Sequence, residues 1–227
     1  MAIYTMGDLH LSLSGSKPMD IFGGWQDYVS RITDFWQETV KDGDWVVLAG
    51  DISWGMSLEE ALIDFKYIDA LPGEKIILKG NHDFWWGSIT KMEKFFLDNG
   101  LKTLHLLHNN CVAAEDKIIC GTRGWMVESD GEPDKKITLR EEGRLRTSIL
   151  SAGNSNLEKI VFLHYPPVYG NRESGKMVEI MQEFHISRCF YGHVHGKAHE
   201  KAINGGYKGL ELALVSADFL KFKLRLV

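Results

Sequence analysis

The chain has 227 residues, 44% hydrophobic and 25% charged, which are ordinary values for a globular protein. Its net charge of −5 argues against non-specific binding to nucleic acid, and three widely spaced cysteines do not suggest a disulfide framework. No apolar run is long enough to cross a membrane and no signal-peptide pattern is apparent. We therefore expect a single cytoplasmic domain over residues 1–227, without a membrane partner.

The first half of the chain alternates predicted strands with predicted helices. Short apolar runs that end near a glycine predict strands at Ala2–Met6, Trp45–Ala49 and Lys75–Lys79. Apolar residues recur every three or four positions between them, which predicts helices at Trp25–Val40, from Ser57 to Leu71 and at Ser88–Asn99. Glu60 follows Ser57 by three residues, a capping-box pattern.

The second half is more mixed. Apolar runs predict strands at Leu101–His108, Cys111–Cys120, Lys159–Leu163 and Arg188–Tyr191. Helices are expected from Thr138 to about Ala152 and at Gly175–Phe184, and a surface loop at Glu128–Lys136. The tail from His199 to Val227 predicts two or three antiparallel strands with a turn at Gly205–Gly206. This order indicates an α/β sandwich, with two packed sheets inside and helices outside.

Five short polar segments each lie just beyond a predicted strand. They are Gly7-Asp8-Leu9-His10, Gly50-Asp51, Gly80-Asn81-His82-Asp83, His164-Tyr165-Pro166 and Gly192-His193-Val194-His195-Gly196. Ligand sites in α/β sheets gather at the carboxyl ends of strands, so we expect these segments to converge. Their glycines allow the backbone to bend sharply beside a site.

Seven side chains in these segments are candidate metal ligands: Asp8, His10, Asp51, Asn81, His164, His193 and His195. Asp and His together form mixed oxygen and nitrogen sites that suit Mn, Fe or Zn. Seven candidates are too many for one ion and suit two ions that share a bridging carboxylate. Two ions about 3.5–4 Å apart are the usual arrangement for displacement at phosphorus, where they polarise phosphoryl oxygens and lower the pKa of a bridging water.

In their order along the chain, the five segments resemble the signature blocks of the calcineurin-like metallophosphoesterases: D-x-H, G-D, G-N-H-[DE], H and G-H-x-H. The blocks run from Gly7 to Gly196, and every ligand position of the pattern is filled. The resemblance implies a four-layer αββα sandwich of two mixed β-sheets flanked by helices. Leu11 after His10 and Ile52 after Asp51 depart from the protein Ser/Thr phosphatases. At these two positions the chain is more similar to the small bacterial phosphohydrolase and phosphodiesterase branch of the family.

The resemblance also implies a role for each polar residue of the blocks. The first metal would be held by Asp8, His10 and His195, and the second by Asn81, His164 and His193, with Asp51 as the bridge. His82 would face the substrate, stabilise the phosphoryl charge and protonate the leaving group. Asp83 would orient His82 and bias its tautomer, with a purely structural role in the turn as the alternative.

Three further residues are candidate substrate contacts. Arg123 lies between two glycines and could reach a phosphate bidentately, or it is a surface arginine in a turn. Trp85, together with Trp86, could wall the substrate pocket or pack the next helix against the sheet. Tyr165 could contact substrate or position the backbone before Pro166.

These residues predict a dinuclear metal-dependent phosphoesterase with two Mn, Fe or Zn ions. We expect it to hydrolyse a small phosphomonoester, phosphodiester or pyrophosphate by attack of a metal-bridging hydroxide. Two alternatives stay open: a catalytically silent metal-binding scaffold for protein interaction, and a nuclease. The presence of His82 argues against the scaffold, because family members that serve as scaffolds have lost catalytic residues. The acidic net charge argues against the nuclease.

Overall fold

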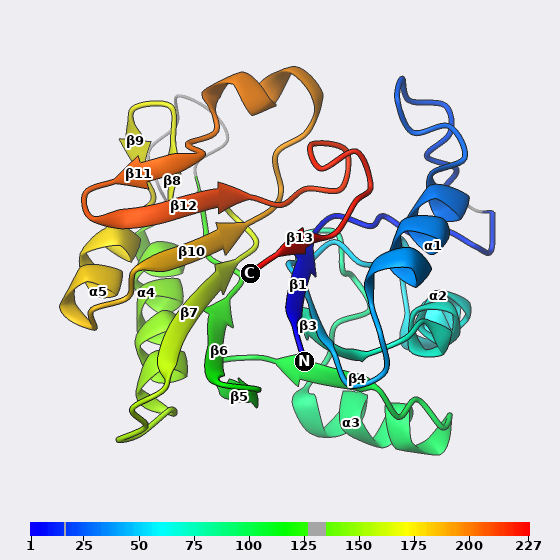
Figure 1. The fold of residues 1–227 in the computed structure, drawn as a ribbon, viewed down its shortest axis with the longest axis horizontal. Coiled ribbons are helices and arrows are strands. Elements are labelled where there is room, and N and C mark those ends of the chain that lie inside the picture. The colour runs from blue at the N-terminus through cyan, green and yellow to red at the C-terminus, as the bar shows by residue number, and fades with distance from the viewer. Residues whose placement is uncertain (16, 127–134) are drawn as a thin grey trace.

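The computed structural model describes residues 1–15, 17–126 and 135–227. Two mixed β-sheets face each other in the middle of the molecule, and helices cover their outer faces (Figure 1). The predicted four-layer αββα architecture is therefore confirmed. The loop expected at Glu128–Lys136 lies mostly outside the described residues, which resume at Lys135 as the first residue of a helix.

The first sheet has five strands in the order β13-β1-β2-β3-β4. Its members are β1 (Ile3–Met6), β2 (Trp45–Leu48), β3 (Glu74–Leu78), β4 (Leu104–Leu107) and β13 (Arg225–Leu226). Strands β1 to β4 run parallel, while β13 pairs antiparallel with β1. The connections between the parallel strands contain α1 (Tyr28–Thr39), α2 (Leu58–Ala70) and α3 (Ile89–Asp98).

The second sheet has six strands in the order β11-β12-β10-β7-β6-β5. Its members are β5 (Cys111–Ala114), β6 (Lys117–Thr122), β7 (Glu158–Leu163), β10 (Arg188–Tyr191), β11 (Gly205–Tyr207) and β12 (Leu210–Leu214). Strands β6, β7, β10 and β12 are parallel, so their carboxyl ends lie at one edge. The remaining elements are α4 (Lys135–Leu150), α5 (Met177–Glu183), the 3₁₀ helix η1 (Gly196–Lys201) and the small hairpin of β8 (Val168–Tyr169) and β9 (Arg172–Glu173).

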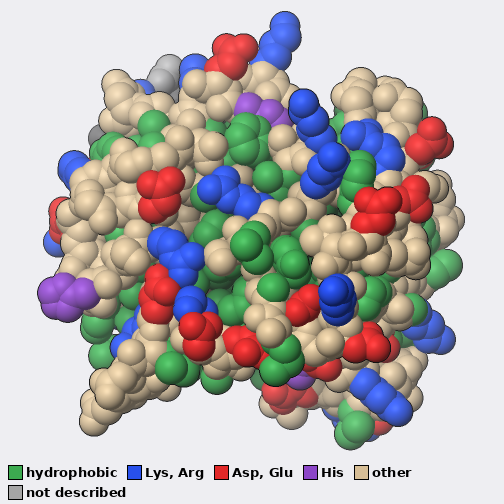
Figure 2. All heavy atoms as spheres, viewed as in Figure 1, with side chains coloured by type: hydrophobic (Ala, Val, Ile, Leu, Met, Phe, Trp, Pro, Cys, Tyr) green, Lys and Arg blue, Asp and Glu red, His purple; other side chains and the backbone are tan. Residues whose placement is uncertain are grey.

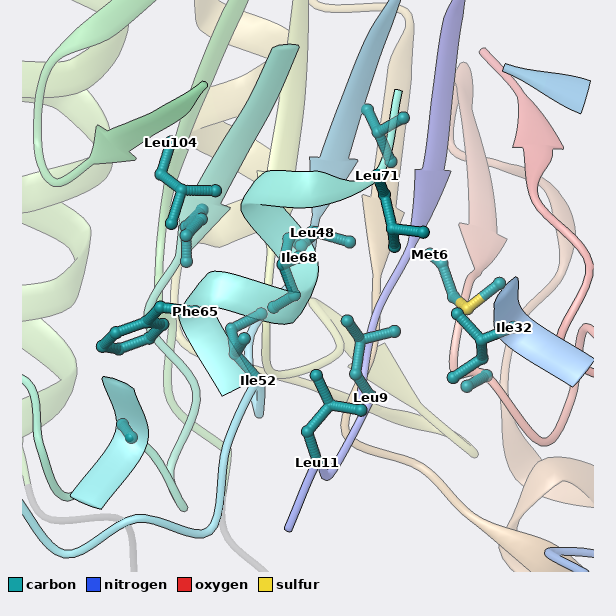
Figure 3. Packing of buried hydrophobic residues seen from close by; sticks show 14 of the residues in the cluster. Met6, Leu9, Leu11, Ile32, Leu48, Ile52, Phe65, Ile68, Leu71 and Leu104 are labelled. Atoms are coloured by element: carbon teal, nitrogen blue, oxygen red, sulfur yellow. The ribbon is translucent and has the colours of Figure 1, made fainter. Parts of the chain in front are cut away.

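Alternation along the strands divides the buried side chains among three layers. Leu48 of β2 packs with Ile32 of α1 and Phe65 of α2 on the outer face of the first sheet (Figure 3). The neighbouring Val47 points the other way, into the layer between the sheets, where it joins Phe162 of β7. A third cluster fills the space between the second sheet and α4 and α5. Successive strand residues point to opposite faces, so buried strands here are apolar on both.

Three sequence-based boundaries need correction. The run Cys111–Cys120 is not one strand but the hairpin of β5 and β6, which turns at Glu115 with a φ of 54°. Helix α4 begins at Lys135, so Thr138 lies inside it and is not its cap. In the tail, Gly205–Gly206 is not the turn but part of β11, and the turn to β12 comes after this strand. Strand β12 is antiparallel to β11 but parallel to its other neighbour, β10. Periodicity did not reveal the turn at Glu115 because apolar runs lie on both sides of it.

The predicted cap of α2 is present. The Ser57 hydroxyl accepts a hydrogen bond from the Glu60 backbone N at 3.2 Å, and the Glu60 carboxylate accepts one from the Met56 backbone N at 2.9 Å. At the other end of this helix, the buried Lys75 ammonium donates to the carbonyl oxygens of Asp69 and Leu71 and to the Thr103 hydroxyl. Burial lowers the pKa of Lys75 to about 8, but these acceptors keep the group hydrogen-bonded.

We expect Lys75→Met to lower the free energy of unfolding by about 2 kcal/mol, because it leaves buried carbonyl oxygens of the α2 terminus without a donor. Urea unfolding followed by circular dichroism measures this difference. Lys66→Met is the matched control, since Lys66 is an exposed residue of the same helix and its loss should change stability by less than about 0.5 kcal/mol. Equal effects of both substitutions would contradict a capping role for Lys75.

All three cysteines are free thiols, which agrees with the absence of a disulfide framework in the sequence, and Cys120 and Cys189 are buried. Across the part of the chain that the structure covers, we find no helix with the length and apolar character needed to span a bilayer. On the face shown in Figure 2, acidic and basic side chains are interspersed.

Candidate active site

The seven candidate ligands lie together, although 187 positions separate the first from the last (195 − 8). They come from the segments that follow β1, β2, β3, β7 and β10, at the edge where the parallel strands of both sheets end. Hydrogen bonds between these segments fix their positions: the Asp8 backbone N donates to the Gly50 carbonyl at 2.8 Å, and the Gly192 backbone N to the His164 carbonyl at 3.1 Å.

The first group of ligand atoms belongs to Asp8, His10 and His195. The Nε2 atoms of His10 and His195 are 3.2 Å apart, and His195 Nε2 lies 3.6 Å from Asp8 Oδ1. These atoms all lie within 4.8 Å of one another, a spacing that allows one ion to contact all three. Asp8 and His10 are buried and His195 is half-buried, so the group is partly open to solvent.

The second group belongs to Asn81, His164 and His193. Asn81 Oδ1 lies 2.6 Å from His164 Nε2 and 2.9 Å from His193 Nδ1. The other ring nitrogen of His164 donates to the Ala49 carbonyl at 3.0 Å, so in the neutral ring Nε2 carries a lone pair. Burial lowers the pKa of His164, which favours that neutral ring. Two acceptor atoms, His164 Nε2 and Asn81 Oδ1, then lie side by side, an arrangement that suits two ligands of one cation.

Asp51 lies between the two groups. Its Oδ2 is 3.7 Å from His10 Nε2, and its Oδ1 is 3.6 Å from His164 Nε2. Oδ1 also accepts a hydrogen bond from the His82 backbone N at 2.8 Å. One carboxylate oxygen is thus directed to each group, which is the geometry required of a bridge.

The backbone is strained at four of the seven candidates. Their φ values are positive: 58° at Asp8, 46° at His10, 52° at Asp51 and 74° at His193. These values lie in the left-handed region, which residues other than glycine rarely adopt. Strain of this kind persists where surrounding contacts enforce it, and it concentrates at functional sites. Gly80 and Gly192 are needed for a different reason, since a Cβ at either position would collide with the carboxylate of Asp51 or Asp8.

The electrostatics of the site favour positive charge. Burial alone would raise the pKa of Asp8, but the hydrogen bond and charge of His195, with the charges of His164 and His10, outweigh it and lower that pKa. Burial and the negative charge of Asp8 raise the pKa of Asp51. Burial would lower the pKa of His195, whereas Asp218 and Asp8 raise it to about 10. Two buried carboxylates with four imidazoles around them form a mixed oxygen and nitrogen donor set, which fits divalent metal ions.

A sequence model of the calcineurin-like phosphoesterase family matches residues 1–197. This chain belongs to the calcineurin-like phosphoesterase family. This is a family of metal-dependent phosphoesterases, and all seven candidate ligands lie within the matched residues. No curated protein matches the sequence significantly.

Solved structures share the fold of this calcineurin-like phosphoesterase at low identity. A protein of unknown function from Aquifex aeolicus, AQ665, aligns with a TM-score of 0.55 and 16% identity over 99% of this chain and 95% of its own. Phosphopantetheinyl hydrolase (PptH) from Mycobacterium tuberculosis aligns with a TM-score of 0.53 and 11% identity over 100% of this chain and 95% of its own. The purple acid phosphatase PPD1 from yellow lupin seeds aligns with a TM-score of 0.50 and 14% identity over 86% of this chain and 38% of its own.

His82 lies beside the ligand groups of this calcineurin-like phosphoesterase. Its ring centroid is 5.7 Å from that of His10 and 4.5 Å from that of Trp54, and the residue is half-buried. Trp54 also stacks on His10, with centroids 4.9 Å apart. Burial and the neighbouring His164 lower the pKa of His82. The imidazole therefore borders the site from the side that remains accessible.

The expected pairing of Asp83 with His82 needs correction. The Asp83 carboxylate instead accepts hydrogen bonds from backbone N atoms: Oδ2 from Asp51 and Gly80 at 2.9 and 2.7 Å, and Oδ1 from Ile52 at 2.8 Å. Burial and the charge of Asp51 raise the pKa of Asp83 to about 7, against these hydrogen bonds. Asp83 thus ties the loop after β2 to the loop after β3, the structural alternative that the sequence left open.

The three candidate substrate contacts have different surroundings. Trp85 is 3% exposed and packs edge-on against Phe65 in the core, which agrees with the packing role that the sequence offered as its alternative. Tyr165 is also buried, with its ring 4.2 Å from that of His193, which places it behind a candidate ligand. Arg123 is half-buried beside Trp125, and its guanidinium lies 3.9 Å from the Glu141 carboxylate.

Two residues of the site were not predicted. The Asp218 Oδ1 lies 3.0 Å from His195 Nδ1, and its Oδ2 accepts from the Gly196 backbone N at 2.9 Å. His195 Nδ1 donates to this carboxylate, which directs Nε2 toward Asp8 and His10. The other residue is Trp54, which stacks on His10 and lies against His82. Neither residue belongs to a signature block, and Asp218 follows the last block by more than twenty residues.

We expect Asp218→Asn to weaken Mn²⁺ binding about 10- to 100-fold. Asn keeps the shape of the Asp218 side chain but lacks the negative charge that holds the His195 ring. Calorimetric titration of the metal-free protein with Mn²⁺ measures the change. Asp98→Asn removes an exposed carboxylate that pairs with Lys94 on α3, and it should leave Mn²⁺ affinity unchanged. Wild-type affinity in Asp218→Asn would exclude a role for Asp218 in ligand positioning.

Proposed function

We propose that this phosphoesterase uses two divalent ions, of Mn, Fe or Zn, to hydrolyse a small phosphomonoester, phosphodiester or pyrophosphate. The first ion would be held by Asp8, His10 and His195, the second by Asn81, His164 and His193, with Asp51 shared. The observation that carries the proposal is the position of Asp51, whose two oxygens lie 3.7 Å from His10 and 3.6 Å from His164.

When bound, two such ions neutralise phosphoryl oxygens and supply an activated water. The chain's own residues supply orientation and a proton. Asp218 and the Ala49 carbonyl hold the rings of His195 and His164 in the tautomers that present Nε2 to the site. These contacts prevent the two rings from adopting other rotamers, so their Nε2 atoms are in place before substrate binds.

His82 is the proposed general acid. In the free protein, burial and neighbouring histidines lower its pKa, which favours a neutral ring. A phosphoryl dianion bound beside it adds negative charge, which raises that pKa and favours the protonated imidazole. His82 would then donate its proton to the leaving oxygen. The hydrogen bond from its backbone N to Asp51 and the contact with the Trp54 ring fix where the imidazole lies.

The proposal is tested with p-nitrophenyl phosphate and bis-p-nitrophenyl phosphate, before and after addition of Mn²⁺, Fe²⁺ or Zn²⁺ to protein stripped with a chelator. We expect metal-dependent release of nitrophenol from at least one ester, and two metal ions per chain by elemental analysis. Protein that binds two ions but hydrolyses neither ester would contradict a broad-specificity phosphoesterase. A single ion per chain would contradict the dinuclear site.

A further inference from the structure

A cavity of about 340 Å³ opens beside the candidate metal site, where β3, β4 and β6 end and the first turns of α4 begin. Four cationic side chains line it: Lys79, Arg123, Arg140 and Arg144. None of the described residues that line it is acidic. We refer to this space as the basic cavity.

The basic cavity has an excess of positive charge. Glu141, buried beneath it, pairs with Arg144 at 2.5 Å, lies 3.9 Å from Arg123 and accepts a hydrogen bond from the Thr122 hydroxyl. Two carboxylates therefore act on the four cations: Glu141 pairs with Arg144 and lies near Arg123, and the charge of Asp83 acts on Lys79. Burial, followed by the positive charges of Arg144 and Lys79, lowers the pKa of His108, which lines the same cavity. An anionic ligand would compensate this charge.

Two buried hydrogen-bond donors of the lining have no acceptor among the described residues. They are the indole Nε1 of Trp86, a residue only 9% exposed, and the Nε of Arg123. Buried donors are nearly always paired in folded proteins, so both atoms call for an oxygen acceptor from water or from a bound ligand. A guanidinium with free N–H groups is suited to a planar fork of two phosphate or carboxylate oxygens.

The basic cavity adjoins the loops that carry the candidate ligands. Lys79 directly precedes Gly80 and Asn81 in the chain. The carbonyl oxygen of Arg123 accepts hydrogen bonds from the backbone N atoms of His164 and Tyr165 at 3.1 and 2.9 Å. The basic cavity and the candidate site therefore share the segment after β3, and the segment after β6 is hydrogen-bonded to the loop that carries His164.

We propose that the basic cavity binds a second phosphoryl group of the substrate, so that this enzyme acts on esters that carry two phosphates. The assignment of this second phosphoryl group to the substrate rests on the proposed function. The binding of an oxyanion in the cavity is independent of that function. A free phosphate ion has the same chemistry as a phosphoryl group, and the two sources are separated below.

The first experiment titrates Mn²⁺-loaded protein with inorganic phosphate by calorimetry. We expect two phosphates per chain, one at the metals and one in the basic cavity. Arg140→Gln and Lys79→Gln should each weaken one of the two about tenfold, because a charge-assisted hydrogen bond is lost. Arg140 is exposed and has no described partner, so its loss leaves the fold intact even if Lys79→Gln does not.

Arg146→Gln is the matched control. It makes the same charge change on the same helix, but Arg146 pairs with Glu183 of α5 and does not line the cavity. We expect wild-type binding of both phosphates in this variant. One phosphate per chain in wild type, or equal weakening by Arg140→Gln and Arg146→Gln, would overturn the basic cavity as an oxyanion site.

The second experiment compares KM for phenyl phosphate with KM for bisphosphates of linear diols of increasing length. We expect one length to bind at least about tenfold more tightly than the monoester, and this advantage to disappear in Lys79→Gln. Two bound phosphates with no advantage at any length would overturn the assignment to substrate and identify free phosphate as the ligand. Protein that hydrolyses none of these esters refutes the proposed function, while the phosphate titration still decides the cavity.

Discussion

Replacing His82 with Ala should lower kcat about 10²- to 10⁴-fold and leave Mn²⁺ binding unchanged, because the ring contributes a proton and not a ligand atom. In the structure, the His82 side chain lies beside the ligand groups, and its backbone N already holds Asp51. Truncation of the ring preserves that backbone contact, so the metal site should remain formed. Steady-state kinetics with a nitrophenyl ester and metal analysis of the same sample measure both quantities.

The leaving group sharpens this test. Nitrophenolate leaves without much help from an acid, whereas an alkoxide needs a proton, so the loss in His82→Ala should be larger for an alkyl phosphate than for the nitrophenyl ester. His105→Ala is the control, since His105 pairs with Glu74 at 2.6 Å and is not among the residues of the site. An equal loss for both leaving groups would remove His82 from the proton transfer.

Much of the fold could be predicted because burial and periodicity coincide in this chain. Strands β1, β2 and β3 are buried on both faces and end at glycines, so their apolar runs were recognisable. The Ser57 cap acts locally and was equally recognisable. The hairpin of β5 and β6 was missed because its turn at Glu115 contains no glycine or proline. The placement of β12 parallel to β10 depends on long-range pairing, which no local pattern encodes.

The candidate ligands could be predicted because each follows a strand in a short signature block, and the blocks fix chain positions that the sheets then bring together. Asp218 could not be predicted in this way. Its contact with His195 exists only because the chain after β12 returns past the site toward β13. The basic cavity has the same origin, since Lys79 follows β3 while Arg140 and Arg144 belong to α4. Such convergence is a property of the tertiary structure alone.

Asp83→Asn should lower the free energy of unfolding by about 3 kcal/mol and weaken metal binding with it, because the amide nitrogen cannot accept a hydrogen bond. Each Asp83 oxygen accepts from at least one backbone N–H: Oδ2 from Asp51 and Gly80, and Oδ1 from Ile52. Either orientation of the Asn side chain therefore sets its NH₂ group against a backbone donor in a buried place. Urea unfolding and Mn²⁺ titration measure the two losses.

Asp83→Glu separates the two roles considered for this residue. Glu keeps both acceptor oxygens and adds one methylene, so we expect it to recover part of the stability and of the metal affinity that Asn loses. If Asp83 acted instead by orienting the His82 ring, Asp83→Asn would lower kcat with unfolding and metal binding intact. The two losses are expected to occur together, because the loops that Asp83 ties to each other carry two candidate ligands, Asp51 on one side and Asn81 on the other.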